Sequence, residues 1–440
     1  MKSLISNLVS VLITLVILSL FCVSCSDETT SAPAHENSGT LDPTFSDDGM
    51  QAYHNVSIDY GQALSIAPNN SVYLVGYSSN GVDFDVVSLK YDTIGTLDTS
   101  FSTDGVDLYD GGNGGDYGFA TALDSAGNLY VAGRSNNAAD YDAVILKYGS
   151  DGVLDTSFGT NGVQMYDGGI GNDVAYGIAI DSDNNLFLAG STDNGSDLDV
   201  LVQKYDATGT LDTTFGTAGV QTYDGGSGND GGRSIVLDSS DNVYVTGYSN
   251  GGVYNDVLVL KYDATGTLDT TFGTAGVRAY DGGSGGEVGH DIVLDSDDNI
   301  YVTGEVYNIS SMNIFVLKYD ATGTLDTTFG TAGVQTYDGG NADLGYGIAL
   351  DSRDRAVVVG SSHNGINNDM VVLRYTTSGI LDPEFDTDGD SDGVVIIDGA
   401  AGTPGSSDSA RSVAIDSSGR LLVAGTSTGT GNDAVVVRLK

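Results

Sequence analysis

Short apolar runs, separated by polar and glycine-rich turns, repeat along most of the chain. Between residues 219 and 262 the runs are Gly219–Tyr223, Ser234–Leu237, Val243–Tyr248 and Asp256–Tyr262. Each run is rich in Val, Ile, Leu, Thr and Tyr and is bounded by Gly, Asp, Asn or Ser, which is typical of β-strands. No apolar pattern of helical period and length interrupts them. The pattern predicts an all-β chain.

These four runs belong to a unit that recurs along the chain. The motif Leu-Asp-x-x-Phe returns at intervals of 56 or 57 residues, and it begins at Leu41, Leu97, Leu154, Leu211, Leu268, Leu325 and Leu381. The segment KYDATGTLDTTFGTAGV stands unchanged at Lys204, Lys261 and Lys318. Because the seven units fill residues 41–440, no separate second domain is expected.

The apolar runs also indicate how the strands pack. VYVTGY at residues 243–248 and VLVLKY at residues 257–262 are apolar on both faces, so both faces of their sheet are expected to be covered. Sheets stacked as blades around an axis provide that cover. Four strands in each of seven units therefore predict a seven-bladed β-propeller of four-stranded blades.

The phase of the repeat predicts how the ring closes. The run before the DSSDN turn is short, with small residues between its apolar ones, as a crowded innermost strand requires; the GVQTYD run is then outermost. With this assignment of inner and outer strands, Gly49–His54 is an outermost strand that precedes the first complete blade. The last unit stops at its third strand, Val435–Leu439. The N-terminal strand is therefore predicted to complete the last blade, which leaves only short, protected edges.

The units resemble a known bacterial repeat. LDTTFGTAG at Leu211–Gly219 and DSAGNLYVAG at Asp124–Gly133 are similar to the LDxxFGxxG and DxxGNxYVxG signatures of the delta-60 repeat family. The resemblance covers residues 41–440. It implies a propeller fold and export from the cell, and it implies no defined activity.

The N-terminus predicts export. A short basic start, MKS, precedes an apolar stretch at residues 4–23, which is the form of a secretory signal peptide, expected over residues 1–24. The end of this stretch, Val23-Ser24-Cys25, resembles a bacterial lipobox, which implies that Cys25 becomes the lipidated first residue of the mature chain. The alternative is an uncleaved membrane anchor, because the stretch approaches the roughly 20 residues that span a bilayer.

Residues 25–40 are expected to form the lipidated N-terminus and a flexible tether, because the segment after Cys25 is polar. Its first residues, SDE at positions 26–28, resemble the acidic signals that send lipoproteins of Bacteroidetes-type bacteria to the outer surface. The chain is therefore expected in the outer membrane or at the cell surface, in contact with the membrane through its lipid alone.

Charge and composition argue against several function classes. The chain has 16 Lys and Arg against 60 Asp and Glu, a net charge of −44, which argues against nucleic acid as a partner. Cys22 and Cys25 are the only cysteines, so residues 41–440 hold no disulfide, thiol nucleophile or cysteine-based zinc site. The four histidines lack metal-ligand spacing, and no Ser-His-Asp order, phosphate loop or nucleotide fingerprint is present. We therefore predict that the protein is not an enzyme.

The loops divide between two faces. The turns after the innermost strands and the connectors before the outermost strands lie on one face, the bottom face, and are nearly identical between units. Asx turns and positive-φ positions explain their Asp, Ser, Asn and Gly. The loops at residues 223–232 and 248–256 lie on the opposite, top face, and their counterparts vary between units. A ligand is therefore expected on the top face.

An acid stands at a fixed distance before the end of every innermost strand. This first acidic ring consists of Asp59, Asp116, Asp173, Asp230, Glu287, Asp343 and Asp408. If these acids circle the mouth of the central channel, a hard cation such as calcium would offset their repulsion, and calcium is the candidate cofactor. The alternative is that each acid caps local backbone N–H groups.

A second acidic ring precedes the third strands. It consists of Asp85, Asp142, Asp199, Asp256, Asn313, Asp369 and Asp433. Asn313 keeps the acceptor oxygen of an acid but lacks its charge, so hydrogen bonding suffices at this position. The second ring is predicted to be structural.

Three residues after the first acidic ring, the residue type changes from unit to unit. These channel residues are Gln62, Phe119, Tyr176, Arg233, His290, Tyr346 and Arg411. A shared scaffold does not require Arg, His, Phe and Tyr at equivalent positions. Aromatic rings beside Arg and Gln could stack on and hydrogen-bond a sugar or a peptide. The alternative is drift at exposed positions.

The last unit carries an acidic insertion, DTDGDSDG at residues 386–393, where other units read FGTAG. Its alternate acids Asp388, Asp390 and Asp392 could take positions one, three and five of a calcium loop. The closing Glu of such a loop is missing, because Gly399 stands at that position. The alternative is a solvated acidic insertion.

These observations predict a cell-envelope lipoprotein whose propeller, as a monomer, recognises or scaffolds an extracellular glycan or protein. Two alternatives stay open, because propellers host several kinds of function. One is a polysaccharide-degrading enzyme that uses one or two acids of the first ring. The other is an architectural surface protein without a specific ligand.

Overall fold

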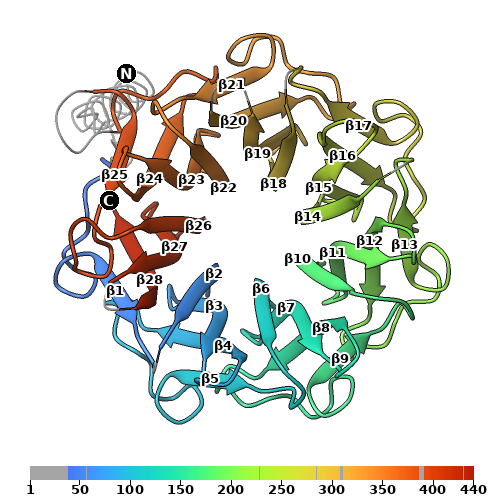
Figure 1. Ribbon diagram of the computed structural model, residues 1–440, viewed down its shortest axis with the longest axis horizontal. Coiled ribbons are helices and arrows are strands. Elements are labelled where there is room, and N and C mark those ends of the chain that lie inside the picture. The colour runs from blue at the N-terminus through green and yellow to red at the C-terminus, as the bar shows by residue number, and fades with distance from the viewer. Residues whose placement is uncertain are drawn as a thin grey trace, which may run out of the picture. The chain divides into compact units, whose positions relative to one another are not determined.

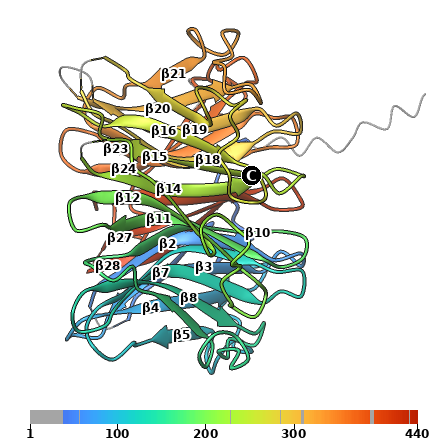
Figure 2. The ribbon, with the colours of Figure 1, turned by 90° about the vertical axis from the view of Figure 1, so that its right-hand side faces the viewer.

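The computed structural model describes residues 38–440 except residues 56, 227, 284, 308–310, 386–390 and 430. Seven four-stranded antiparallel sheets stand as blades around a central channel (Figure 1). The strands run between two faces of the ring, where the loops gather (Figure 2). The described residues contain no helix long and apolar enough to cross a membrane. The all-β, seven-bladed prediction is confirmed.

Each blade runs outward from the channel, strand by strand. The innermost strands are β2 (Asp59–Ile66), β6 (Asp116–Leu123), β10 (Val174–Ile180), β14 (Asp230–Leu237), β18 (Glu287–Leu294), β22 (Asp343–Leu350) and β26 (Asp408–Ile415). The second strands are β3 (Val72–Ser79), β7 (Leu129–Asn136), β11 (Leu186–Asp193), β15 (Val243–Ser249), β19 (Ile300–Tyr307), β23 (Ala356–His363) and β27 (Leu421–Thr428). The third strands are β4 (Phe84–Tyr91), β8 (Tyr141–Tyr148), β12 (Leu198–Tyr205), β16 (Asp256–Tyr262), β20 (Met312–Tyr319), β24 (Asn368–Tyr375) and β28 (Asn432–Leu439). The outermost strands are β5 (Val106–Tyr109), β9 (Val163–Tyr166), β13 (Val220–Tyr223), β17 (Val277–Tyr280), β21 (Val334–Tyr337), β25 (Val394–Ile397) and β1 (Met50–Tyr53).

The two ends of the described chain close the ring in one blade. The N-terminal strand β1 pairs antiparallel with the C-terminal strand β28, with Met50 opposite Val437 and Tyr53 opposite Ala434. The seventh sheet therefore has the order β1-β28-β27-β26. This confirms the closure that the phase of the repeat predicts.

The innermost strands differ from the prediction in length. The apolar run Ser234–Leu237 is only the lower half of β14, which begins at Asp230. Between Gly232 and Ser234 the register with β15 shifts by one residue, so Arg233 is the extra residue of a β-bulge. A bulge breaks the alternation of apolar and polar positions, which is why the upper half of the strand carries no strand signal in the sequence.

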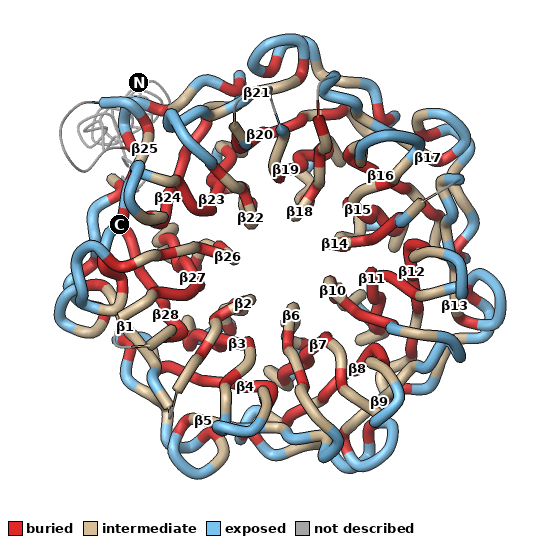
Figure 3. The backbone as a smooth tube through the Cα atoms, in the orientation of Figure 1, coloured by how far each residue is buried: buried red, intermediate tan, exposed pale blue. Residues whose placement is uncertain are grey.

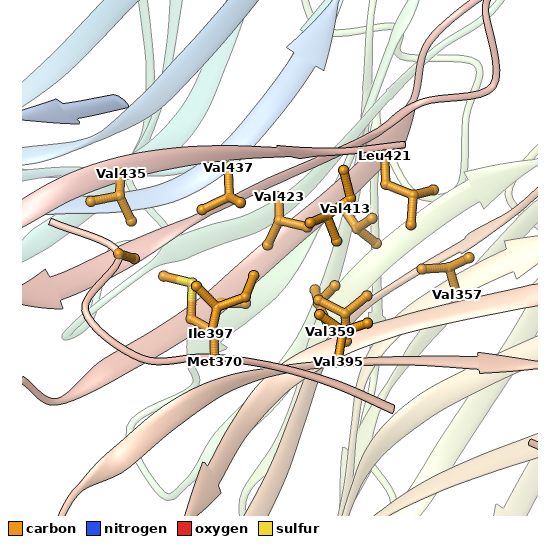
Figure 4. Close-up of a cluster of buried hydrophobic side chains, with 14 of the residues drawn as sticks. Val357, Val359, Met370, Val395, Ile397, Val413, Leu421, Val423, Val435 and Val437 are labelled. Carbon is orange, nitrogen blue, oxygen red and sulfur yellow. The ribbon is translucent and has the colours of Figure 1, made fainter. Parts of the chain in front are cut away.

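The hydrophobic core lies between adjacent blades. The described residues form seven clusters, and each joins the facing sides of two neighbouring blades. Figure 4 shows the cluster between the sixth and seventh blades, where Val359 and Met370 meet Val413 and Val435. The middle strands are therefore buried on both faces, as predicted, while exposed residues gather in the loops and at the rim (Figure 3).

The repeated motifs of the bottom face have structural roles. In Leu-Asp-x-x-Phe, Phe101 is fully buried and packs edge-on against Tyr73, with their ring centroids 5.7 Å apart. In the DSSDN turn, Asp238 Oδ1 accepts hydrogen bonds from the backbone N–H groups of Ser240 and Asn242 at 2.8 and 3.0 Å. These are the Asx turns expected on this face.

Candidate functional site

The structure brings all seven channel residues together. They line one cavity of about 290 Å³ in the central channel, each from a different innermost strand. All seven side chains are half-buried, so part of each is accessible from the channel. Their positions match the sequence prediction, and their role in binding stays a prediction.

A common backbone feature places these side chains. In every innermost strand the channel residue is the extra residue of a β-bulge, as Phe119 is between Gly118 and Ala120. A bulged residue is left out of the ladder, and bulges near functional sites turn a side chain into a new direction. The bulge therefore explains both why these residues reach the channel and why their type is free to vary.

The cavity is lined unevenly. On one side the Arg233 guanidinium lies 4.4 Å from the Tyr176 ring centroid, and on another the Arg411 guanidinium lies 3.9 Å from that of Tyr346. His290 packs against Tyr346 at 5.2 Å, and its Nε2 lies 2.7 Å from Glu305 Oε2. Guanidinium groups placed over aromatic rings form a surface that can both stack and donate hydrogen bonds.

The sequence analysis missed an aromatic patch beside this cavity. The patch lies at the top ends of the first two blades and consists of Tyr60, Tyr77, Phe84, Tyr117, Tyr141 and Arg134. The Tyr77 and Tyr117 rings, from neighbouring blades, lie 4.9 Å apart, and the Arg134 guanidinium lies 4.3 Å from the Tyr141 ring centroid. Phe119 joins the patch to the channel, stacked at 6.2 Å on Tyr117.

A signal for this patch was present in the repeat. Tyr77 and Arg134 follow the glycine of the second strand, and the same position holds Ser191, Tyr248 and Glu305 in the next three blades. Residue type therefore varies here as it does among the channel residues. The variation that indicated the channel would also have indicated the patch.

The first acidic ring does not line the channel, so the predicted place of these acids is wrong. The seven acids, Asp59, Asp116, Asp173, Asp230, Glu287, Asp343 and Asp408, have exposed fractions of 0–1% and none of them borders the cavity. The Oδ2 of Asp116 accepts a hydrogen bond from the backbone N–H of Gly111 at 2.6 Å, and Asp230 does the same with Gly225 at 2.6 Å. The capping alternative therefore holds for Asp116 and Asp230, whereas neither oxygen of Glu287 has a partner of normal hydrogen-bond geometry among the described residues.

The two acidic rings are not separate. At five blade junctions an acid of the second ring and one of the first ring meet a third acid, which directly follows the outermost strand. These junction triads are Asp85–Asp110–Asp116, Asp142–Asp167–Asp173, Asp199–Asp224–Asp230, Asp256–Asp281–Glu287 and Asp369–Asp398–Asp408. One ligand oxygen from each acid lies within 4.8 Å of the other two, so each triad could hold a metal ion.

The third acid of each triad was missed by the sequence analysis. In four triads it belongs to the recurrent segment Tyr-Asp-Gly-Gly, and in the fifth Asp398 follows Ile397. Asp110 also accepts the N–H of Gly112 at 2.7 Å in an Asx turn. The recurrent Asp after the outermost strand can therefore be explained by its role in a turn, without a metal ion. The second ring is held in part by hairpin amides, since Asn137 Nδ2 donates to both oxygens of Asp142 at 3.0 Å.

Other predicted site residues lie outside the described chain or at its edge. Residues 1–24, Cys25, Asp388 and Asp390 are outside the described residues. Asp392 is exposed, and its Oδ1 accepts the N–H of Val394 at 2.8 Å.

Family models agree with the fold. One described as "Domain of unknown function (DUF5122) beta-propeller" matches residues 127–158, 182–215, 239–272, 296–329 and 355–385. Another, described as "Beta-propeller repeat", matches residues 221–255 and 401–431. The chain therefore carries propeller repeats. A comparison with curated proteins gives no match.

Solved structures with a similar fold have diverse functions. The polysaccharide lyase Uly1 is 11% identical, with 88% of this chain and 91% of that chain covered at a TM-score of 0.47. Semaphorin 2a of Drosophila is 10% identical, with 89% and 75% covered at 0.48. The calcium structure of a family AA12 carbohydrate-active enzyme from Trichoderma reesei is 14% identical, with 87% and 98% covered at 0.40. These likenesses concern the fold alone.

Proposed function

We propose that the protein is a non-catalytic recognition module that binds an extracellular glycan through the top of its central channel. The observation that carries this proposal is the ring of bulged channel residues around one cavity. Seven side chains of seven strands face the same space, and their chemistry is not that of a packed core.

The lining suits the chemistry of a sugar. Aromatic rings such as Tyr176 and Tyr346 offer flat apolar faces for the C–H groups of a sugar ring, and Arg233 and Arg411 offer donors for hydroxyl or carboxylate groups. The aromatic patch extends this surface across the top of the first two blades. A chain of sugar units could therefore run from the cavity over the patch.

The proposal also covers the cellular location of the protein, the family of its repeats and the cation that it binds. The chain is proposed to be exported and held at the outer membrane or cell surface through a lipid on Cys25, with the propeller acting as a monomer. Its units are proposed to be delta-60 repeats. Calcium is proposed as the cation of the acidic top face, because carboxylate oxygens are the ligands that calcium prefers.

Retention on polysaccharides tests the binding proposal. Native gels containing single polysaccharides, neutral and anionic, would be run with the wild type and with a Tyr176→Ala, Arg233→Ala, Arg411→Ala variant. We expect at least one polysaccharide to retard the wild type and the variant to lose about tenfold or more in affinity, which corresponds to about 1.4 kcal/mol. Its melting temperature should stay within a few degrees of the wild type.

The matched control changes exposed bottom-face residues. Ile94→Ala with Val153→Ala removes side chains that are 57% and 59% exposed, and it should leave retention unchanged. Equal retardation of the wild type and the channel variant would contradict the proposal. A wild type that no polysaccharide retards would favour the architectural alternative.

One observation favours the enzymatic alternative with His290, in place of the acids of the first ring, as the catalytic group. The acids of the first ring are buried and do not face the cavity, but His290 faces it and pairs with Glu305 at 2.7 Å. An imidazole oriented by a carboxylate is suited to general-base work. Release of reducing ends from a polysaccharide by the wild type, lost in His290→Ala, would establish this alternative.

A further inference from the structure

The junction triads join neighbouring blades at their top ends. In the triad Asp142–Asp167–Asp173, Asp142 lies on the third strand of the second blade and Asp167 follows its outermost strand. Asp173 directly precedes β10, the innermost strand of the third blade. Two members are buried and Asp167 is exposed, so the triad is open to solvent on one side only.

In four of the five triads a buried acid holds a carboxylate oxygen without a partner of normal hydrogen-bond geometry among the described residues; the exception is Asp369–Asp398–Asp408. Asp173 is fully buried; its Oδ2 accepts the N–H of Gly168 at 2.6 Å, while its Oδ1 has no such partner. Asp116 has the same arrangement, and both oxygens of the buried Glu287 lack a partner of normal hydrogen-bond geometry among those residues. Buried acceptors are nearly always satisfied, so these oxygens indicate a ligand.

The charges of the triads point the same way. One oxygen from each of the three acids lies within 4.8 Å of the other two. Three carboxylates at this spacing repel one another unless a cation lies between them.

The two remaining junctions hold fewer acids, although Asp59 Oδ1 and Asp343 Oδ1 are also without a partner there among the described residues. Where the ring closes, His54 stands in place of the third acid, and its Nδ1 lies 2.7 Å from Asp433 and 3.9 Å from Asp59. The junction before Asp343 has Asn313 in place of an acid and therefore one charge fewer. Fewer negative groups thus face one another at both junctions.

We propose that each of the four junction triads with an unpaired buried oxygen, all except Asp369–Asp398–Asp408, binds one calcium ion. The ion links the third and outermost strands of one blade to the innermost strand of the next. The three carboxylates offer up to six oxygens, and water on the open side completes the six to eight that calcium takes. The five triads hold no His or Cys, which disfavours zinc, and magnesium gives up its water reluctantly.

The proposed ions would also steady the recognition surface. Each first-ring acid stands three residues before a channel residue on the same strand, as Asp230 does before Arg233. An ion at the start of the strand would therefore fix the strand just above its bulge. The inference assigns sites to the calcium that is part of the proposed function. Glycan binding by the cavity is tested separately, because retention on polysaccharides can be measured in EDTA, where no calcium is bound.

Calcium counting tests the inference. The protein is stripped with EDTA and dialysed against millimolar CaCl₂ in physiological NaCl, and the bound metal is measured by elemental analysis. We expect four ions, one for each triad with an unpaired buried oxygen, and one fewer in Asp142→Asn. We expect one more in Asn313→Asp, which completes a triad around the unpaired Asp343 Oδ1. Calcium should also raise the melting temperature of the wild type more than MgCl₂ at equal ionic strength.

A surface acid serves as the matched control. Asp183 is exposed in a bottom-face turn, so Asp183→Asn should keep the wild-type count. A wild type that binds no calcium would overturn the inference. So would bound calcium whose number is unchanged in both Asp142→Asn and Asn313→Asp, because it would then lie elsewhere.

Discussion

Gly247 shows how single residues allow the bulges on which the site depends. It lies on β15 opposite the bulge of β14, and a Cβ at this position would overlap the carbonyl oxygen of Gly231. The second strand of every blade has a glycine here, and each would meet the same obstacle: Gly76, Gly133, Gly190, Gly247, Gly304, Gly360 and Gly425. The channel residues therefore depend on glycines of the neighbouring strand.

Gly247→Ala is expected to destabilise the protein by about 3 kcal/mol, because the added methyl group displaces backbone rather than a flexible side chain. Urea unfolding monitored by circular dichroism measures this free energy of unfolding. The control is Gly251→Ala, where a Cβ meets no atom within 4 Å, and its effect should stay within about 0.5 kcal/mol. Similar values for the two variants would show that the close approach is not needed.

At the scale of elements, the ring depends on the pairing of β1 with β28. The pairing is reinforced by Asp42, whose Oδ2 lies 2.9 Å from Arg438 Nε, with both residues only 2% exposed. Although burial opposes ionisation, Thr44 and Arg438 outweigh it and lower the pKa of Asp42. The N-terminal segment is thus held to the last blade by a strand and by a buried ion pair.

Asp42→Ala should reduce stability by about 3–5 kcal/mol at neutral pH, because it leaves Arg438 buried without its carboxylate. Since the pKa of Asp42 is lower in the folded state, its contribution is complete above the ordinary value of 3.8 and is lost as the pH falls through the folded-state pKa. The difference in melting temperature between variant and wild type, measured as a function of pH, should therefore shrink below pH 3.8. A difference that is independent of pH would contradict this role.

The elements also show which features the sequence could predict. Closure by β1 followed from the order of the strands within each repeat unit, because each strand leaves at least a short apolar run at a fixed place in the unit. The triads did not follow, because Asp142, Asp167 and Asp173 belong to three elements whose top ends meet only after the blades pack. The channel residues could be identified because their residue type changes from unit to unit. The bulge that directs their side chains could not be predicted, because it interrupts the alternation of apolar and polar residues that indicates a strand.

In the molecule as a whole, the two faces of the ring differ in how closely their loops repeat and in the groups that they carry. The bottom face repeats nearly identical turns that hold Phe101 and its counterparts in place, whereas the top face varies and carries the cavity, the aromatic patch and the triads. The chain has a net charge of −44, most of it carried by the ring, and this charge opposes folding through self-repulsion.

Screening should therefore stabilise the protein. Raising NaCl from 0.1 to 1 M shortens the Debye length from about 10 to about 3 Å, and we expect the melting temperature in EDTA to rise by several degrees. KCl should act equally, because the effect is not specific to an ion. A fall in melting temperature would show that attractive pairs outweigh the net repulsion.

The most direct test of glycan recognition by the channel uses the absence of tryptophan from the chain. Tyr176→Trp places a single tryptophan at the cavity and Ile94→Trp places one on the bottom face, and each is excited at wavelengths where the tyrosines do not absorb. Each variant is titrated with a polysaccharide that retards the wild type. We expect a saturable change in emission from the Trp at position 176 and none from the Trp at position 94. A change confined to position 94, or absent from both variants, would contradict glycan recognition by the channel.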